Sequence, residues 1–86
     1  MKKNTIKKIR ENHVKRRSME RFGIYLSRKD QEEIVRTIRE GKAEFLKRES
    51  NAKKHFKVEY HGKIFRVVYS KKHRCLLTVL PIEFEE

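Results

Sequence analysis

The chain has 86 residues, 42% of them charged, and a formal net charge of +12. A chain this short forms one small domain, which we take as residues 1–86 with a basic lead (1–8) and an acidic tail (82–86). A membrane protein is excluded, because no apolar run approaches the roughly 20 residues of a span. No apolar stretch typical of a signal peptide follows the basic start. Cys75 is the only cysteine, so we expect no internal disulfide and a cytoplasmic location.

The positive charge is concentrated in two segments. Residues 1–21 contain nine Lys or Arg against two Glu, and residues 51–81 contain eight against one. Phosphate polymers suit such segments, because the release of counterions gives affinity that does not depend on sequence. A membrane surface is a poorer partner, because the basic N-terminal segment lacks the large apolar face that enters a bilayer. We therefore expect RNA as the partner and no membrane.

Two helices are predicted in the first half of the chain. The first begins at about Thr5 or Glu11 and ends at Phe22, where Gly23 can adopt a left-handed conformation. The second covers about Arg28 to Glu40. Ser27 and Asp30 have the spacing of a capping box at its start, and Gly41 ends it. Its apolar stripe consists of Ile34, Val35 and Ile38.

Four strands follow, because the apolar period changes from helical to alternating after Ala43. They cover 43–48, about 55–60, 63–69 and 75–80, with a tight turn at His61-Gly62 and a stop at Pro81. We predict an α+β domain in which two N-terminal helices pack on a four-stranded antiparallel sheet, in the order α-α-β-β-β-β. The expected core is Ile34, Ile38, Phe45, Phe56, Val58, Phe65, Val67, Leu77 and Val79.

The segment H-V-K-R-R-S-M-E-R carries the clearest functional signal. His13, Arg17 and Arg21 are four residues apart and share a face of the first helix, with Ile6, Ile9 and Arg10 further back on it. Charges where a core helix presents leucines are more common at sites than elsewhere. A solvated basic face would also give this pattern.

Together with V-V-Y (67–69) and T-V-L-P (78–81), this segment resembles sequences of the superfamily that contains barnase, the colicin nuclease domains and the RelE-type toxins (the BECR fold). Within that superfamily, the chain is most similar to an uncharacterised bacterial and phage branch with a helical H-x-x-x-R-x-x-x-R. The resemblance covers about residues 11–81. It implies a metal-independent ribonuclease with an acid/base residue at His13 and sheet partners at Tyr69 and Thr78. A second helix histidine and a barnase-like glutamate base are missing.

The chemistry of this set fits RNA cleavage. A histidine exchanges protons near neutral pH, and an arginine stabilises phosphoryl oxygens in pairs. The second proton carrier is open between Tyr69 and His73, while Thr78 would orient a phosphate or ribose. Tyr69 and Thr78 could equally be ordinary strand residues. Further contacts to nucleic acid are expected from Arg10, Lys15, Arg16, Lys57, Arg66, Lys71, Lys72 and His73.

The sequence favours neither a metal site nor a cofactor. One cysteine without a C-x-x-C pair argues against structural zinc, and three scattered glycines form no phosphate cradle. His55 and His61 receive no role. The expected function is a toxin-like endoribonuclease acting on RNA, for example a structured RNA such as tRNA, and neutralised by an acidic antitoxin. The alternative is a non-catalytic basic RNA- or DNA-binding module.

Overall fold

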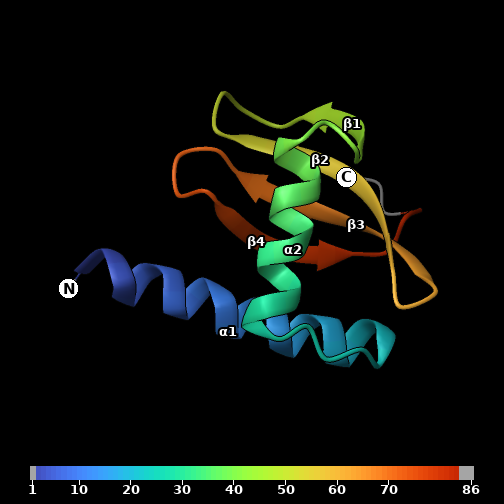
Figure 1. Cartoon of the computed structure of the whole chain (residues 1–86), viewed down its shortest axis with the longest axis horizontal. Coiled ribbons are helices and arrows are strands. Elements are labelled where there is room, and N and C mark those ends of the chain that lie inside the picture. Colours follow the sequence, from blue (N-terminus) through green and yellow to red (C-terminus); the bar gives the residue numbers. More distant parts are fainter. Residues whose placement is uncertain (1, 84–86) are drawn as a thin grey trace.

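The computed structural model describes residues 2–83, with side chains from Lys8 onward, as two helices and four strands (Figure 1). The helices are α1 (Lys2–Phe22) and α2 (Arg28–Arg39). The strands are β1 (Glu44–Arg48), β2 (Lys53–Tyr60), β3 (Lys63–Ser70) and β4 (Cys75–Leu80), which form one antiparallel sheet in the order β1-β2-β3-β4. The predicted α+β order of elements is confirmed.

The helix ends follow the local signals. Ser27 and Asp30 form the predicted capping box at the start of α2. At its end, the N–H of Gly41 (φ 75°) donates to the Ile38 carbonyl oxygen, and the N–H of Lys42 donates to the Thr37 carbonyl oxygen. These two bonds form a Schellman motif. In contrast, α1 begins at Lys2, so most of the predicted basic lead is helical. Met1 and residues 84–86 of the acidic tail lie outside the described residues.

The sheet is a meander whose strands are joined by short connections. His61 and Gly62 both have positive φ angles (53° and 75°), as a two-residue type I′ hairpin requires. β2 and β3 pair without interruption from Lys53↔Ser70 to Tyr60↔Lys63. β4 contains a bulge. Thr78 pairs with Val68 and Leu76 pairs with the next β3 residue, Tyr69, so Leu77 has no opposite residue in β3.

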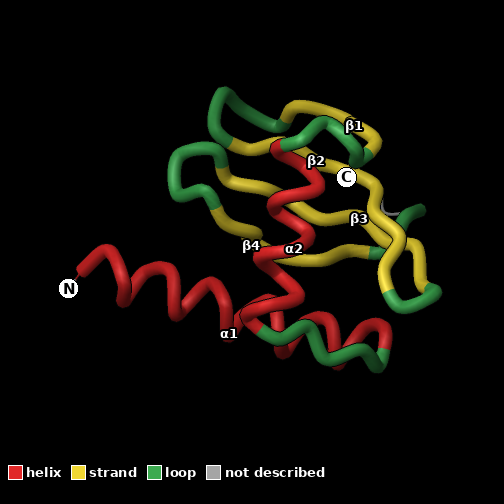
Figure 2. The backbone as a smooth tube through the Cα atoms, viewed as in Figure 1, coloured by secondary structure: helices red, strands yellow, loops and turns green. Residues whose placement is uncertain are grey.

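Both helices pack on the same face of the sheet (Figure 2). α2 crosses this face and α1 lies along β4 (Figure 1). Six of the predicted core residues are buried in the cluster between the layers, and Phe56 packs against it half-buried. The buried cluster consists of Val14, Leu26, Ile34, Ile38, Val58, Phe65, Val67, Tyr69, Leu76 and Val79.

Two core predictions need correction. Phe45 is 53% exposed, because β1 is an edge strand and the ring has an aromatic neighbour, Phe56, on one side only. Leu77 is buried but is the bulge residue, so Leu76 takes its place in the cluster. Val14 and Leu26 were missing from the prediction, because a single apolar residue in a basic helix and one in a linker give no periodic signal.

A polar contact joins α2 to the end of β2. The Tyr60 hydroxyl lies 2.7 Å from Asp30 Oδ1 and 2.8 Å from Glu33 Oε1. Burial and these two carboxylates raise the pKa of Tyr60, and its hydrogen bond is the main reason that the pKa of Asp30 lies below the ordinary 3.8. A phenol has one proton, so it donates to one carboxylate at a time.

We expect Tyr60→Phe to lower the free energy of unfolding by about 1–2 kcal/mol at neutral pH, because a hydrogen bond to a charged group is lost. Ionised Asp30 contributes this stability above its unfolded pKa. The contribution is lost as the pH falls through the lower folded pKa, so the difference from wild type should shrink in acid.

Urea denaturation of both proteins at neutral and acidic pH measures this. Tyr25→Phe serves as the control, because the Tyr25 ring is exposed. An equal loss in the two variants, or a difference that does not change with pH, would show that the link is not stabilising.

Candidate nucleic-acid interface

The site begins with the rotation of α1, which is set by two buried residues. Val14 is 0% exposed and Ser18 is also buried. Ser18 satisfies its hydroxyl by donating to the Lys15 carbonyl oxygen at 3.0 Å. Because residues i and i+4 share a helix face, these two positions fix the side of α1 that faces the sheet.

One flank of α1 faces α2. The Gln31 side chain donates to the Glu11 carbonyl oxygen at 3.1 Å. Lys15 pairs with Glu11 at 3.1 Å and lies over the Tyr25 ring, 5.7 Å from its centroid. The hydrogen bond to Glu11 is the main reason that the pKa of Lys15 is raised. Lys15, predicted to bind nucleic acid, therefore has a carboxylate partner here.

Arg10, His13, Arg17 and Arg21 lie on the other flank, which we call the α1 flank. The first three are half-buried and Arg21 is exposed. The predicted shared face is thus present, but it lies beside the buried side of the helix. Ile9 was expected to extend it as an apolar stripe and is instead 61% exposed, and the Ile6 side chain lies outside the described residues.

The environment of His13 favours its neutral form. Partial burial is the main reason that the pKa of His13 lies below its ordinary value of 6.5. Arg17, Arg16, Arg10 and Arg21 lower the pKa further, because a positive imidazolium is repelled by nearby guanidiniums. An imidazole in this state accepts a proton and stands among groups that bind phosphate.

The guanidiniums of the α1 flank differ in their partners. Arg17 Nη1 lies 3.3 Å from Glu20 Oε1, a pair that is exposed to solvent and therefore weak. Arg21 makes no ion pair within the part of the chain that the structure describes. Either side chain can turn to a phosphate at small cost.

The two predicted sheet partners of His13 lie on opposite faces of the sheet. Tyr69 belongs to the buried cluster beneath the helices, and its ring packs edge-on against Phe56. Thr78 pairs with Val68, whose side chain points to the other face because neighbouring strand residues alternate. The structure therefore does not bring Tyr69 and Thr78 together, and one site cannot contain both.

A buried histidine that the sequence did not single out lies on this second face. His55 is 1% exposed, and its ring joins Glu49 to Arg66. Arg66 Nη1 is 3.2 Å from His55 Nδ1, and His55 Nε2 is 2.9 Å from Glu49 Oε1. Arginine can only donate, so Nδ1 accepts and the Nε2 proton goes to Glu49. This bond is the main reason that the pKa of Glu49 is lowered.

The remaining predicted nucleic-acid residues are spread over several surfaces. Arg16 is exposed on α1, and Lys57 on β2 lies 3.7 Å from Glu44. Arg66 points to the face opposite the helices, where its Nε is buried without a partner. The β3–β4 turn carries Lys71, Lys72 and His73, of which the lysines are exposed and the histidine is half-buried.

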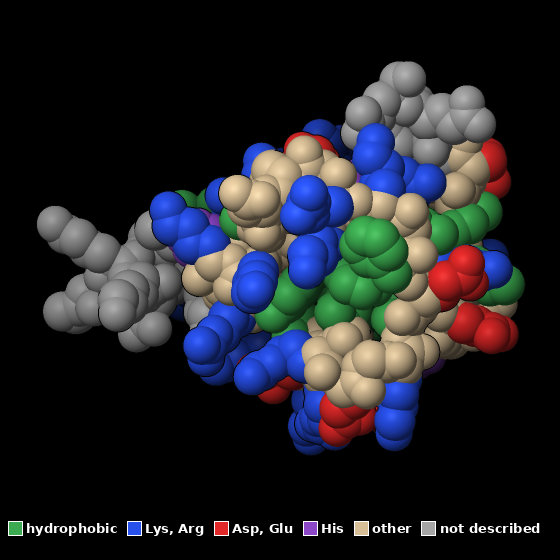
Figure 3. Space-filling model, turned by 90° about the horizontal axis from the view of Figure 1, so that it is seen from above, with side chains coloured by type: hydrophobic (Ala, Val, Ile, Leu, Met, Phe, Trp, Pro, Cys, Tyr) green, Lys and Arg blue, Asp and Glu red, His purple; other side chains and the backbone are tan. Residues whose placement is uncertain are grey.

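Seen from above, the charge is divided between two sides of the molecule. Lys and Arg side chains crowd the left half of Figure 3, and most Asp and Glu side chains visible there lie at the right and lower edges. Within residues 2–83, no group of three or more His, Cys, Asp or Glu side chains is placed to hold a metal ion. Neither described helix is long and apolar enough to cross a membrane.

We expect Arg17→Gln to raise the pKa of His13 toward 6.5 without reaching it, because the largest charge effect is removed while burial remains. NMR titration of the His13 ring protons measures the shift. Arg28→Gln on α2, whose arginine pairs with Glu32, is the control and should leave the value unchanged. An unchanged pKa in Arg17→Gln would refute the role of the guanidinium.

We expect nitrogen NMR at neutral pH to find His55 with its proton on Nε2. Glu49→Ala should lower the free energy of unfolding by about 1–3 kcal/mol, because the buried Nε2–H loses its acceptor. Glu44→Ala, at a more exposed carboxylate, should have a smaller effect. A proton on Nδ1 in the wild type would contradict the hydrogen-bond assignment.

Comparisons with known proteins do not identify a family. No protein-family model, curated protein or solved structure matches this chain. The α1 flank and the charge around it are therefore the features that point to a function.

Proposed function

We propose that this chain is a small metal-independent endoribonuclease in which the α1 flank binds RNA and His13 exchanges protons with it. The observation that carries the proposal is the position of His13 on α1 beside Arg10, Arg17 and Arg21, where partial burial and these guanidiniums lower its pKa. The H-x-x-x-R-x-x-x-R spacing and the resemblance to the barnase and RelE superfamily support the same assignment.

In the proposed reaction, a ribose 2′-oxygen attacks the adjacent phosphorus and the bond to the 5′-oxygen breaks. His13 takes the proton of the 2′-hydroxyl. Arg17 and Arg21 bind the phosphoryl oxygens, on which negative charge increases in the transition state. Because Tyr69 lies in the core, we assign protonation of the leaving 5′-oxygen to water, and the hydroxide that remains takes the proton held by His13. The products are a 2′,3′-cyclic phosphate and a free 5′-hydroxyl.

The proposal includes partners and a location. The substrate is RNA, for example a structured RNA such as tRNA, and the setting is the cytoplasm. A toxin of this kind would be neutralised by an acidic antitoxin that covers the α1 flank through charge complementarity.

A second candidate is a non-catalytic basic RNA- or DNA-binding module. It is favoured by one observation: Tyr69 and Thr78 lie on opposite faces of the sheet, so the sheet does not complete a site for His13. If this second candidate is right, the arginines of α1 bind phosphates and His13 has no catalytic role.

We expect the wild type to cleave a mixed RNA substrate in EDTA and His13→Ala to cleave about 10²–10⁴ times more slowly, the usual contribution of one general acid or base. RNA affinity and folding should change little, because His13 is half-buried and its lowered pKa favours the uncharged imidazole. Gel analysis of the products and mapping of their ends measure the rate and the chemistry.

His61→Asn is the matched control. It removes an exposed histidine from the β2–β3 turn, and asparagine tolerates the left-handed backbone there. Equal cleavage by wild type and His13→Ala would refute the catalytic proposal. Binding by both without any product would favour the binding module.

A further inference from the structure

A groove lies between α1, α2 and the start of β4, apart from the α1 flank. Its volume is about 1010 Å³, and it is open to solvent. Val35 supplies apolar surface within it, and the buried Leu76 lies at its base. Its charged walls include Arg36 and Arg39 from α2 and Arg74 from the β3–β4 turn.

The groove is positively charged once its ion pairs are counted. Three glutamates also line it, and each already has a cation. Glu11 pairs with Lys15 at 3.1 Å, Glu32 with Arg28 at 3.3 Å, and Glu40 with Lys42 at 3.5 Å.

Arg36, Arg39 and Arg74, by contrast, have no carboxylate within 4 Å among the residues that the structure describes. Their guanidiniums are open to an anion that enters the groove. Because the glutamates are compensated, such an anion meets a net positive wall.

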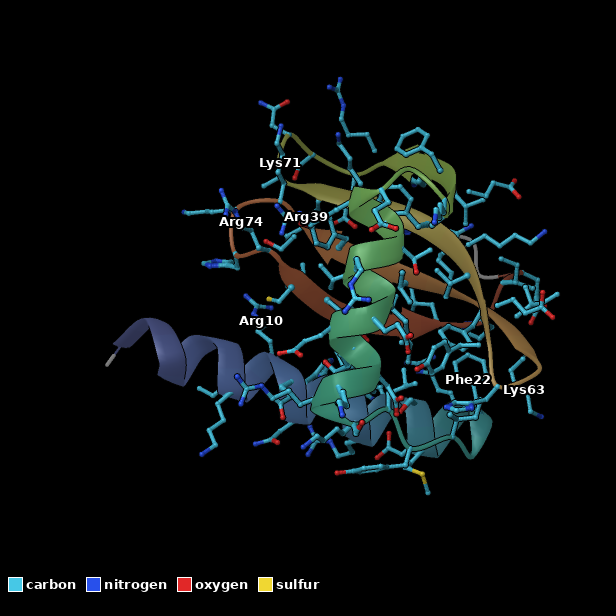
Figure 4. All side chains as sticks on the ribbon, in the orientation of Figure 1. Arg10, Phe22, Arg39, Lys63, Lys71 and Arg74 are labelled. Atoms are coloured by element: carbon cyan, nitrogen blue, oxygen red, sulfur yellow. The ribbon has the colours of Figure 1, made fainter. Side chains whose placement is uncertain are left out.

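The arginines come from different elements and converge on one end of the molecule. Figure 4 shows Arg39 on α2 and Arg74 on the β3–β4 turn near each other, and both line the groove. Arg74 has a left-handed backbone (φ 54°), which is uncommon for a residue with a side chain. Cations on separate walls can bind successive phosphates of one chain.

We propose that this groove binds the sugar–phosphate backbone of a single-stranded stretch of RNA. A duplex is convex and is read by elements that protrude into it, whereas a basic concave groove follows the backbone of a single strand. None of the described residues lining the groove is aromatic. Bases therefore have no aromatic ring to stack on in the groove, and we expect little preference for base sequence.

The inference rests on the proposed function, because the single-stranded RNA in the groove is the same molecule that His13 cleaves. The helix α1 connects the two places, because Glu11 lines the groove and His13 lies on the α1 flank. The groove would then hold nucleotides beside the cleaved bond, so longer RNA would bind more tightly than short fragments.

The test measures binding without cleavage. A fluorescent 2′-O-methyl oligonucleotide of about 12 nucleotides, within the usual site size, lacks the attacking hydroxyl. Its affinity for wild type and for Arg39→Gln/Arg74→Gln is measured by anisotropy over a range of salt. We expect about tenfold weaker binding at low salt, and a salt slope reduced by about 1.4, which corresponds to two lost phosphate contacts on a single strand.

Lys29→Gln/Lys63→Gln is the matched control. It removes the same charge from two exposed lysines outside the groove, and it should change affinity and salt slope much less. Thermal melting checks that both double variants fold. Equal losses in the two variants would overturn the groove assignment and leave only general attraction by net charge.

Two further binding measurements distinguish the groove from the catalytic site and RNA from an acidic protein. His13→Ala should bind the oligonucleotide like wild type, so loss of cleavage and loss of groove binding are independent results. A poly-glutamate peptide of equal charge that binds as tightly, and weakens as much in Arg39→Gln/Arg74→Gln, would overturn the RNA assignment in favour of an acidic protein.

Discussion

The buried contact of Val14 and Ser18 decides the orientation of every charge on α1. With these two positions against the sheet, helix geometry sends Glu11 and Lys15 toward α2, where they have partners. Arg10, His13 and Arg17 are left on the opposite flank. A rotation of α1 by one residue, about 100°, would bury a guanidinium without a partner, at a cost of several kcal/mol. Val14 and Ser18 together therefore fix where the basic surface can be used.

The fold was predictable because its signals are local. The capping box of Ser27, the glycine after α2 and the His61-Gly62 turn each determine backbone geometry within a few residues. The alternation in β2 and β3 gives the sheet its buried face. The errors arose where long-range geometry decides. Phe45 is exposed because β1 is an edge strand, and the β4 bulge exchanges Leu76 for Leu77 in the core. No sequence period shows either fact.

The candidate site was predictable only in part, for a similar reason. Spacing alone places His13, Arg17 and Arg21 on one helix face. It cannot tell whether a strand residue points toward that helix, so Tyr69 and Thr78 were grouped although they lie on opposite faces. The Glu49–His55–Arg66 chain joins a turn and two strands, and the groove joins two helices and a turn. Such sets are separated in the sequence and come together only through the register and the packing of the layers.

The excess of cations is itself an argument for a polyanion. The ion pairs of Arg17, Arg28 and Lys42 are exposed and contribute little to stability, so they do not offset the repulsion within a chain of charge +12. That repulsion is strongest where unpaired arginines converge, at the α1 flank and in the groove. A ligand that binds only the folded state stabilises it more the more tightly it binds, and a strand of phosphates would do so by relieving the same repulsion. The places where arginines lack carboxylate partners are therefore the places where a phosphate backbone relieves repulsion on binding.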